Sequence, residues 1–429
     1  MTTLVRGQLF HTPHNPFKEE GALETYPDGA LIVEGGIITA VGEYVNLSKT
    51  YPDARLLDFK DLYIFPGFVD THVHYPQIPI IGAMGLRLLE WLQTRTLPEE
   101  ENFAEASYAR AQAKLFLRQL ALNGTTTALV FGAHFAPAMD VFFEEAAQSG
   151  LRITSGLVLG DRLLTDALHT TPERAYTENK RLIKTWHNKD RLRYAVTPRF
   201  SLSCGDALLE VCSTLMGETS DLFFTSHINE QTDEVSTVLS LFEGARDYLE
   251  TYDKHGLVTP RSVFAHNVHV YDRELSRLAE VGSSIAHCPS SNMFIGSGLF
   301  PMRRHLSFGV HFALGSDVGG GTGFSLFKEG LMAYQAQMLH DDGYPLTSAH
   351  LLYLATAAGA RALHLEDTVG DFSPGKQADF VVAQPDEGST LEVALSHSPS
   401  AEASLAALFT LAREECITDV YVAGESVKG

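Results

Sequence analysis

Apolar runs that end in a histidine or an aspartate recur along this chain of 429 residues. The first leads into His72 and His74, and later runs end at His227, His266 and Asp317. Residues i and i+2 of a strand face the same side, so His72 and His74 can direct both imidazoles at one point. Parallel strands that share one carboxyl-terminal edge would bring the other three side chains to the same place.

Between the two ends of the chain, predicted strands alternate with predicted helices, which is typical of parallel strands covered by helices. We read residues 62–65 as a first strand entering the core and leading to His72 and His74. Helical periodicity is clearest at residues 103–123, 172–187, 233–252 and 271–281. Further strands are expected at residues 125–131, 152–159, 192–197, 222–227, 262–266, 283–287 and 311–315. Eight such units predict an α/β fold, a (β/α)₈ TIM barrel with its active site at the carboxyl ends of the strands.

Short strands also recur near both ends of the chain. They are expected at residues 4–10, 30–34 and 37–41, and again at residues 379–383 and 420–424. We expect both ends to share one small β-sandwich beside the barrel. The predicted segments are residues 1–65 for its N-terminal part, residues 66–372 for the barrel, and residues 373–429 for its C-terminal part.

The strand-end side chains predict a metal site. We take His72, His74, His227 and Asp317 as the ligands, because three neutral imidazoles and one carboxylate suit a borderline ion such as zinc. Any one of them could instead satisfy a local backbone group, but that explanation does not suit all of them together. The predicted strand at residues 192–197 offers no lysine that could be carboxylated to bridge two metals. We therefore expect one Zn²⁺ per chain.

Together with further motifs, these residues resemble the amidohydrolase superfamily and, within it, the guanine deaminase family. The broader signals are Pro66 to His74, His227, His266, Asp317 and residues 375–381. The narrower signals are Gln77 and residues 89–92, 198–200, 226–230 and 286–292. The resemblance runs from near residue 30 to the C-terminus. It implies a metal-dependent barrel that hydrolyses guanine to xanthine and ammonia.

Three residues are predicted to be catalytic. Asp317 could accept a proton from the attacking water, and Glu230 could pass a proton to a ring nitrogen and to departing ammonia. His266 would bond the attacking water or the developing oxyanion, and the resemblance implies the same three roles. Glu230 could instead cap the helix that follows it. His269 is an alternative to His266, which we prefer because it closes the apolar run.

Substrate binding is predicted at Gln77, Arg199, Phe200, His227, Glu230 and Asp317. Gln77 offers a donor and an acceptor, and Arg199 offers donors only, beside the aromatic face of Phe200. Arg199 could also be an ordinary surface ion-pair partner. This complementarity fits guanine as the small-molecule substrate, but it also fits other oxo-purines or pterins. We expect His134 to end its strand without a metal role, and His287 to lie near the metal without binding it.

The charge balance is strongly acidic, with 32 basic and 53 acidic residues and a formal net charge of −21. A nucleic-acid partner is not expected, because such partners bind basic surfaces. No membrane segment or leader is visible, so we expect a cytoplasmic enzyme, and we expect a homodimer with four buried free thiols. Two alternatives remain open. One is an amidohydrolase that deaminates or dechlorinates another purine, pterin or triazine-like heterocycle, and the other is a non-catalytic assembly protein with this fold.

Overall fold

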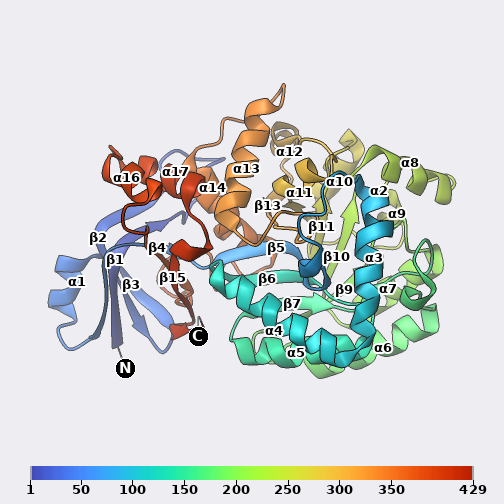
Figure 1. The fold of residues 1–429 in the computed structure, drawn as a ribbon, viewed down its shortest axis with the longest axis horizontal. Helices are drawn as coiled ribbons and strands as arrows, with labels where there is room; N and C mark the ends of the chain where they lie inside the picture. Colours follow the sequence, from blue (N-terminus) through green and yellow to red (C-terminus); the bar gives the residue numbers. More distant parts are fainter. Residues whose placement is uncertain (1, 428–429) are drawn as a thin grey trace.

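The computed structural model describes residues 2–427 as a β/α barrel with a separate β-sheet beside it (Figure 1). The barrel occupies the right of the view, and the sheet lies on the left with both chain ends. The predicted α/β barrel is confirmed, and the β unit expected from both chain ends is present as one seven-stranded sheet. All four cysteines are buried and free, as expected.

Eight parallel strands follow one another around the barrel, each hydrogen-bonded to the next. In chain order they are β5 (Phe68–His74), β6 (Thr125–Phe131), β7 (Arg152–Gly156), β9 (Leu192–Pro198), β10 (Phe223–Ile228), β11 (Ser262–His266), β12 (Ser284–His287) and β13 (His311–Leu314). A short strand, β8 (Val158–Leu159), continues the line of β7 and also pairs with β9. The predicted strand at residues 152–159 is therefore interrupted at Leu157.

The seam between β5 and β13 is joined by specific bonds. The Thr71 hydroxyl donates to the carbonyl of Leu314 at 2.8 Å, and the amide of Asp317 donates to the carbonyl of His72 at 2.8 Å. The buried carboxylate of Asp70 accepts the amide of Ser316 at 3.0 Å. These bonds hold the ends of the first and last strands beside each other.

Helices cover the outside of the barrel (Figure 1). The longer ones are α4 (Ala106–Leu122), α5 (Ala136–Ser149), α6 (Pro172–Trp186), α7 (Asp206–Glu218), α8 (Thr232–Leu241), α10 (Asp272–Val281), α13 (Leu326–Leu339) and α14 (Ser348–Ala355). The shorter ones are α9 (Glu250–Asp253), α11 (Pro289–Phe294), α12 (Met302–Phe308) and α15 (Ala357–Ala362). After β5, a helical segment runs through α2 (Leu88–Trp91), a π-helical turn (Leu92–Thr96) and α3 (Leu97–Glu101). This segment stands at the front of the barrel in Figure 1.

The second sheet takes strands from both ends of the chain. Its order is β16 (Glu425–Ser426), β15 (Ile417–Val422), β14 (Phe380–Ala383), β4 (Arg55–Pro66), β1 (Thr2–His11), β2 (Glu24–Glu34) and β3 (Ile37–Glu43). The helices α1 (Tyr44–Thr50), α16 (Thr390–Ser396) and α17 (Ala401–Leu411) belong to the same chain ends. A buried bidentate ion pair ties the sheet to the barrel, because Arg152 of β7 contacts both carboxylate oxygens of Asp379 at 3.0 and 3.1 Å.

Two sequence predictions were wrong in their extent. Residues 62–65 belong to β4 and pair with β14 of the second sheet, not with the barrel. The chain changes sheets at Gly67, where a side chain would meet the hydroxyl of Thr126 at 2.1 Å. The predicted helix at residues 233–252 is broken into α8 and α9, because Gly244 adopts φ +87° in the turn between them.

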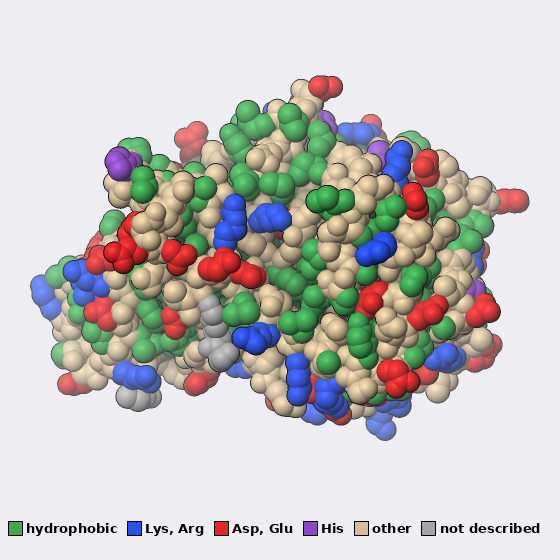
Figure 2. Space-filling model, in the orientation of Figure 1, with side chains coloured by type: hydrophobic (Ala, Val, Ile, Leu, Met, Phe, Trp, Pro, Cys, Tyr) green, Lys and Arg blue, Asp and Glu red, His purple; other side chains and the backbone are tan. Residues whose placement is uncertain are grey.

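The surface drawn in Figure 2 carries acidic and basic side chains interspersed with apolar ones. Within residues 2–427, no helix is both long enough and apolar enough to cross a bilayer.

Candidate active site

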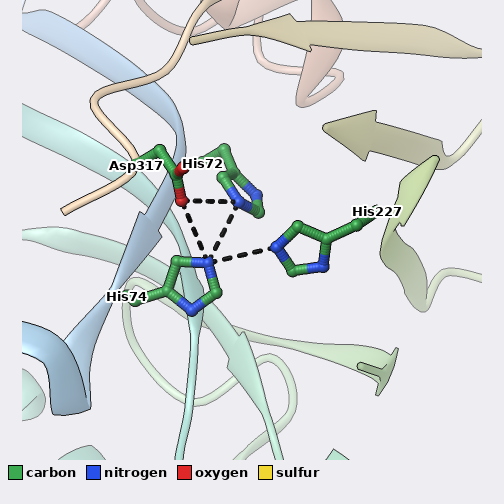
Figure 3. Close-up of side chains that lie close together, drawn as sticks. All are labelled: His72, His74, His227 and Asp317. Atoms are coloured by element: carbon green, nitrogen blue, oxygen red, sulfur yellow. Dashed lines mark hydrogen bonds and ion pairs between the residues drawn. The ribbon is translucent and has the colours of Figure 1, made fainter. Parts of the chain in front are cut away.

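Four buried side chains converge at the carboxyl ends of the barrel strands (Figure 3). His72 and His74 come from β5, His227 comes from β10, and Asp317 follows β13. The Nε2 atoms of His72 and His74 are 3.1 Å apart, and both lie within 3.2 Å of Asp317 Oδ1. The Nε2 atom of His227 lies 3.2 Å from that of His74. These are the four predicted metal ligands.

The donor set fits a divalent metal. Nitrogen ligands about 2.0–2.1 Å from a tetrahedral ion lie roughly 3.3 Å apart, which is close to the separations between these imidazoles. The Nδ1 atom of His227 lies 2.7 Å from the carbonyl of Arg199, so it carries the proton and leaves the Nε2 lone pair free. Burial lowers the pKa of His72 to about 4 and that of His227 well below its usual value, which keeps both imidazoles neutral. Neutral imidazoles are the form that binds metal.

Left-handed backbone conformations mark the strand ends around this cluster. The residues Asn229, His266 and Asp317 have φ values of 49°, 74° and 48°. Such values are uncommon for residues other than glycine, and they concentrate at functional sites. At His266 and Asp317, this local conformation belongs to residues that we predicted to be functional.

A second group lies beside the four ligands. The Nε2 atom of His266 is 3.4 Å from Glu230 Oε2 and 3.9 Å from Asp317 Oδ2. The Nδ1 atom of His266 lies 2.9 Å from the amide oxygen of Asn292, which fixes the ring orientation. The Ser297 hydroxyl donates to Glu230 Oε1 at 2.9 Å. The three predicted catalytic residues are therefore neighbours in the fold.

The two carboxyl groups have pKa values displaced in opposite directions. Burial, together with the negative charge of Asp317, raises the pKa of Glu230 to about 8. Burial acts on Asp317 in the same direction, but hydrogen bonds from His72 and His74 outweigh it and hold the Asp317 pKa well below its usual value. At neutral pH, Glu230 therefore holds a proton and Asp317 is ionised.

A cavity of about 350 Å³ opens in front of these groups. The polar wall contains His74, Gln77, Arg199, His227, Glu230, His266 and Asp317. The apolar wall contains Leu88, Trp91, Leu92, Phe200 and Ile295. Every predicted site residue except His72 lines this cavity, and His72 contacts His74 and Asp317 behind it.

Glu100 was not predicted from the sequence. Its carboxylate is buried and accepts Arg199 Nη1 at 2.6 Å and Gln77 Nε2 at 3.0 Å. The Nε2 atom of His134 lies 3.2 Å from the same carboxylate. Glu100 sits in the acidic run of residues 99–101, which reads as a solvated helix face. The sequence signal for its burial was the helical spacing that places Glu100 on the same face as the apolar residues Leu92 and Phe103.

Three further histidines that the sequence offered as site residues lie outside the four-ligand group. His134 lies outside the four-ligand group and contacts Glu100. The Nε2 atom of His269 lies 2.8 Å from the carbonyl of Ser297 and not at the metal cluster. His287 is buried against Phe300, with ring centroids 4.3 Å apart, and it is not part of the ligand group.

Comparison with known proteins places this geometry in a family. The sequence profile of the amidohydrolase family matches residues 63–427. The chain belongs to the amidohydrolase family. The match covers the barrel and the C-terminal strands of the second sheet, as the motifs suggested.

Individual members of the amidohydrolase family resemble the chain over nearly its whole length. A probable guanine deaminase of Deinococcus radiodurans is 56% identical over 427 residues, covering 98% of this chain and 97% of that protein. The solved structure of guanine deaminase from E. coli superimposes with a TM-score of 0.94 at 38% identity, covering 100% and 99% of the two chains. The guanine deaminase from C. acetobutylicum, solved with guanine in its active site, gives 0.92 at 27% identity and covers 99% and 100%.

Proposed function

We propose that this amidohydrolase is a guanine deaminase, which converts guanine and water to xanthine and ammonia. The observation that carries the proposal is the 56% identity to a probable guanine deaminase over 98% of the chain. The cavity supports it, because three of the four metal-site residues line it together with the residues assigned to proton transfer and ring recognition. In the reaction, the carbon that bears the amine gains a bond to oxygen and loses its bond to nitrogen.

We assign one zinc ion per chain to His72, His74, His227 and Asp317. This donor set and its spacing support the assignment. A bound zinc ion supplies Lewis-acid activation of water at neutral pH. The protein supplies four ligand atoms that already face one another and a backbone carbonyl that orients His227.

Proton transfer is assigned to two carboxyl groups with opposite displacements of their pKa values. Such a pair commonly separates the acid from the base of a reaction. The ionised Asp317 can take the proton of the attacking water, and the protonated Glu230 can deliver its proton to a ring nitrogen. His266 lies between them and is held by Asn292, so its Nε2 faces the position where oxygen would add.

Recognition of the ring is assigned to Gln77, Arg199 and Phe200. One lone pair of the Gln77 amide oxygen accepts the amide of Gly319 at 3.2 Å, and the other remains for a ligand. Among residues 2–427, the guanidinium of Arg199 makes its hydrogen bonds through Nη1, so Nε and Nη2 remain available. Phe200 adds an aromatic surface on the same side of the cavity.

Ammonia release from a panel of purines and pterins, combined with elemental analysis, tests the function. We expect guanine to be deaminated with the highest kcat/KM and about one zinc per chain. Preferred turnover of a pterin or of another purine would replace guanine as the substrate. Absence of turnover across the panel in zinc-loaded protein would favour a non-catalytic role.

Other proposals concern the protein as a whole. We propose that it is located in the cytoplasm, that it forms a homodimer and that it has no nucleic-acid partner. Light scattering after gel filtration tests the assembly, and a mass of one chain would refute it. We also keep the division into segments 1–65, 66–372 and 373–429, which limited proteolysis tests.

A further inference from the structure

Glu100 links two of the proposed recognition residues. Its Oε2 accepts Arg199 Nη1 at 2.6 Å, and its Oε1 accepts Gln77 Nε2 at 3.0 Å. The three side chains come from α3, from the turn after β9 and from the turn after β5. None of the three is more than 3% exposed. One carboxylate therefore joins separate parts of the cavity wall.

We propose that Glu100 is a positioning residue that fixes Arg199 and Gln77 for substrate recognition and, by balancing the Arg199 charge, favours an uncharged ring. The inference rests on the proposed function. Glu100 is not among the residues that line the cavity, so it acts through the two side chains that do.

Glu100 engages some of the N–H donors of Arg199 and Gln77 and leaves other polar atoms of these side chains for a ligand. An unrestrained arginine side chain loses considerable rotamer freedom when it binds a ligand. The bond to Glu100 uses Nη1 and holds the planar guanidinium, which leaves Nε and Nη2 for a ring. The same carboxylate holds one N–H of the Gln77 amide and thereby turns its oxygen toward the amide of Gly319 and the cavity.

Glu100 also balances the buried charge of Arg199. A buried cation without a partner is strongly disfavoured, and it attracts anions into a cavity. Glu100 is the carboxylate that contacts Arg199, and the third group at this point, His134, has its pKa lowered by burial. Arg199 and Glu100 together are neutral, so the recognition wall offers directed donors without a net positive charge.

The same contact anchors a wall of the cavity. Glu100 belongs to the helical segment that contains Leu88, Trp91 and Leu92, which supply apolar lining. Its bonds to Arg199 and Gln77 fasten the end of that segment to the strand ends of the barrel. Loss of the carboxylate would therefore loosen polar and apolar contacts to the ring together.

The first test is Glu100→Gln, which keeps the shape of the side chain. An amide offers one acceptor oxygen and places an NH₂ group against the donors of Gln77 or Arg199. We expect KM for guanine to rise by about ten- to a hundredfold while kcat changes much less, with metal content unchanged. The matched control is Glu101→Gln, a half-buried neighbour without a side-chain hydrogen bond in residues 2–427, which should behave like the parent protein.

A double-mutant cycle tests whether Glu100 acts through Arg199. Contacting residues are not additive, so the combined loss in kcat/KM for guanine of Glu100→Gln with Arg199→Ala should be clearly smaller than the product of the two single losses. Losses that multiply would overturn the inference. The thermal midpoint and zinc content of each variant separate a folding defect from a recognition defect.

An anionic purine supplies a readout that a purely structural role would not move. Urate is a monoanion at neutral pH, and Glu100→Gln leaves Arg199 with an uncompensated charge. In the Glu100→Gln protein, we expect the inhibition constant for urate to fall by about tenfold or more while KM for guanine rises. Weaker binding of both purines, or unchanged KM for guanine, would overturn the inference. A parent protein that releases no ammonia from guanine would refute the proposed function, and titration calorimetry with guanine and urate would still test Glu100.

Discussion

Replacement of Glu230 by glutamine separates proton transfer from metal binding. The side chains have nearly the same shape, and the Ser297 hydroxyl, 2.9 Å from Glu230 Oε1, can donate to an amide oxygen as well. Glu230 is not one of the four converging ligands. The substitution therefore removes an acidic proton while leaving the metal site and the cavity in place.

The expected magnitude follows from that proton. Loss of a positioned general acid or base typically costs about 10²- to 10⁴-fold in rate. At about 1.4 kcal/mol for each factor of ten, this corresponds to roughly 3–5 kcal/mol of transition-state stabilisation. The contacts of Gln77, Arg199 and Phe200 with the ring are untouched, so most of the loss should appear in kcat.

The assay measures ammonia release from guanine as a function of pH, with zinc determined on the same samples. In the parent protein, activity should fall as the pH rises and Glu230 loses its proton, with a midpoint above the usual range of a carboxyl group because burial raises the Glu230 pKa. Glu230→Gln should lose this alkaline limb. Ser297→Ala should move the limb to higher pH, because the Ser297 hydrogen bond lowers the Glu230 pKa. A Glu230→Gln protein without zinc, or with parental kcat, would refute the assignment.

Three further predictions address the metal, recognition and the fold. Strong chelation should remove about one zinc per chain and abolish turnover, and full activity after verified metal removal would contradict this. The His72→Ala protein should lose more zinc than the Asp317→Asn protein, because the amide oxygen of asparagine can still coordinate. Arg199→Lys keeps the charge but loses the planar fork, so kcat/KM for guanine should fall by about ten- to a hundredfold with zinc unchanged, and a parental value would remove Arg199 from recognition. Asp379→Ala leaves Arg152 buried without its partner and should lower the free energy of unfolding by about 3–5 kcal/mol in chemical denaturation, whereas an unchanged value would show that the pair is dispensable.

The sequence predicted the strand ends of the site because polar residues interrupt apolar runs there. His227 and His266 close such runs, and the structure places both at the ends of consecutive barrel strands. The alternation of strands and helices predicted parallel strands, and the carboxyl ends of parallel strands meet at one edge of the barrel. This pattern brought five side chains together, His266 among them, and the family resemblance supported the choice of the four ligands.

Contacts between distant residues could not be predicted in the same way. The bond from Arg199 to Glu100 joins residues 99 positions apart, and neither local sequence indicates the other residue as its partner. The contact between Asn292 and His266 spans 26 positions and depends on how α11 packs against β11. Residues 62–65 were predicted to begin the first barrel strand, although the predicted boundary at residue 65 left them outside the barrel segment. Strands of either sheet show the same apolar pattern, and the close approach at Gly67 marks the change from one sheet to the other.

The order of strands in the second sheet has a consequence for biosynthesis. The strand β4 lies between β1, which precedes the barrel in the chain, and β14, which follows it. While the ribosome is still translating the barrel, the edge of β4 that will pair with β14 has no partner, and such an edge is prone to pair with other chains. We expect nascent chains stalled before Phe380 to aggregate or to bind chaperones more than chains released after β15. Ribosome-bound chains of graded length, assayed for protease resistance, would test this expectation.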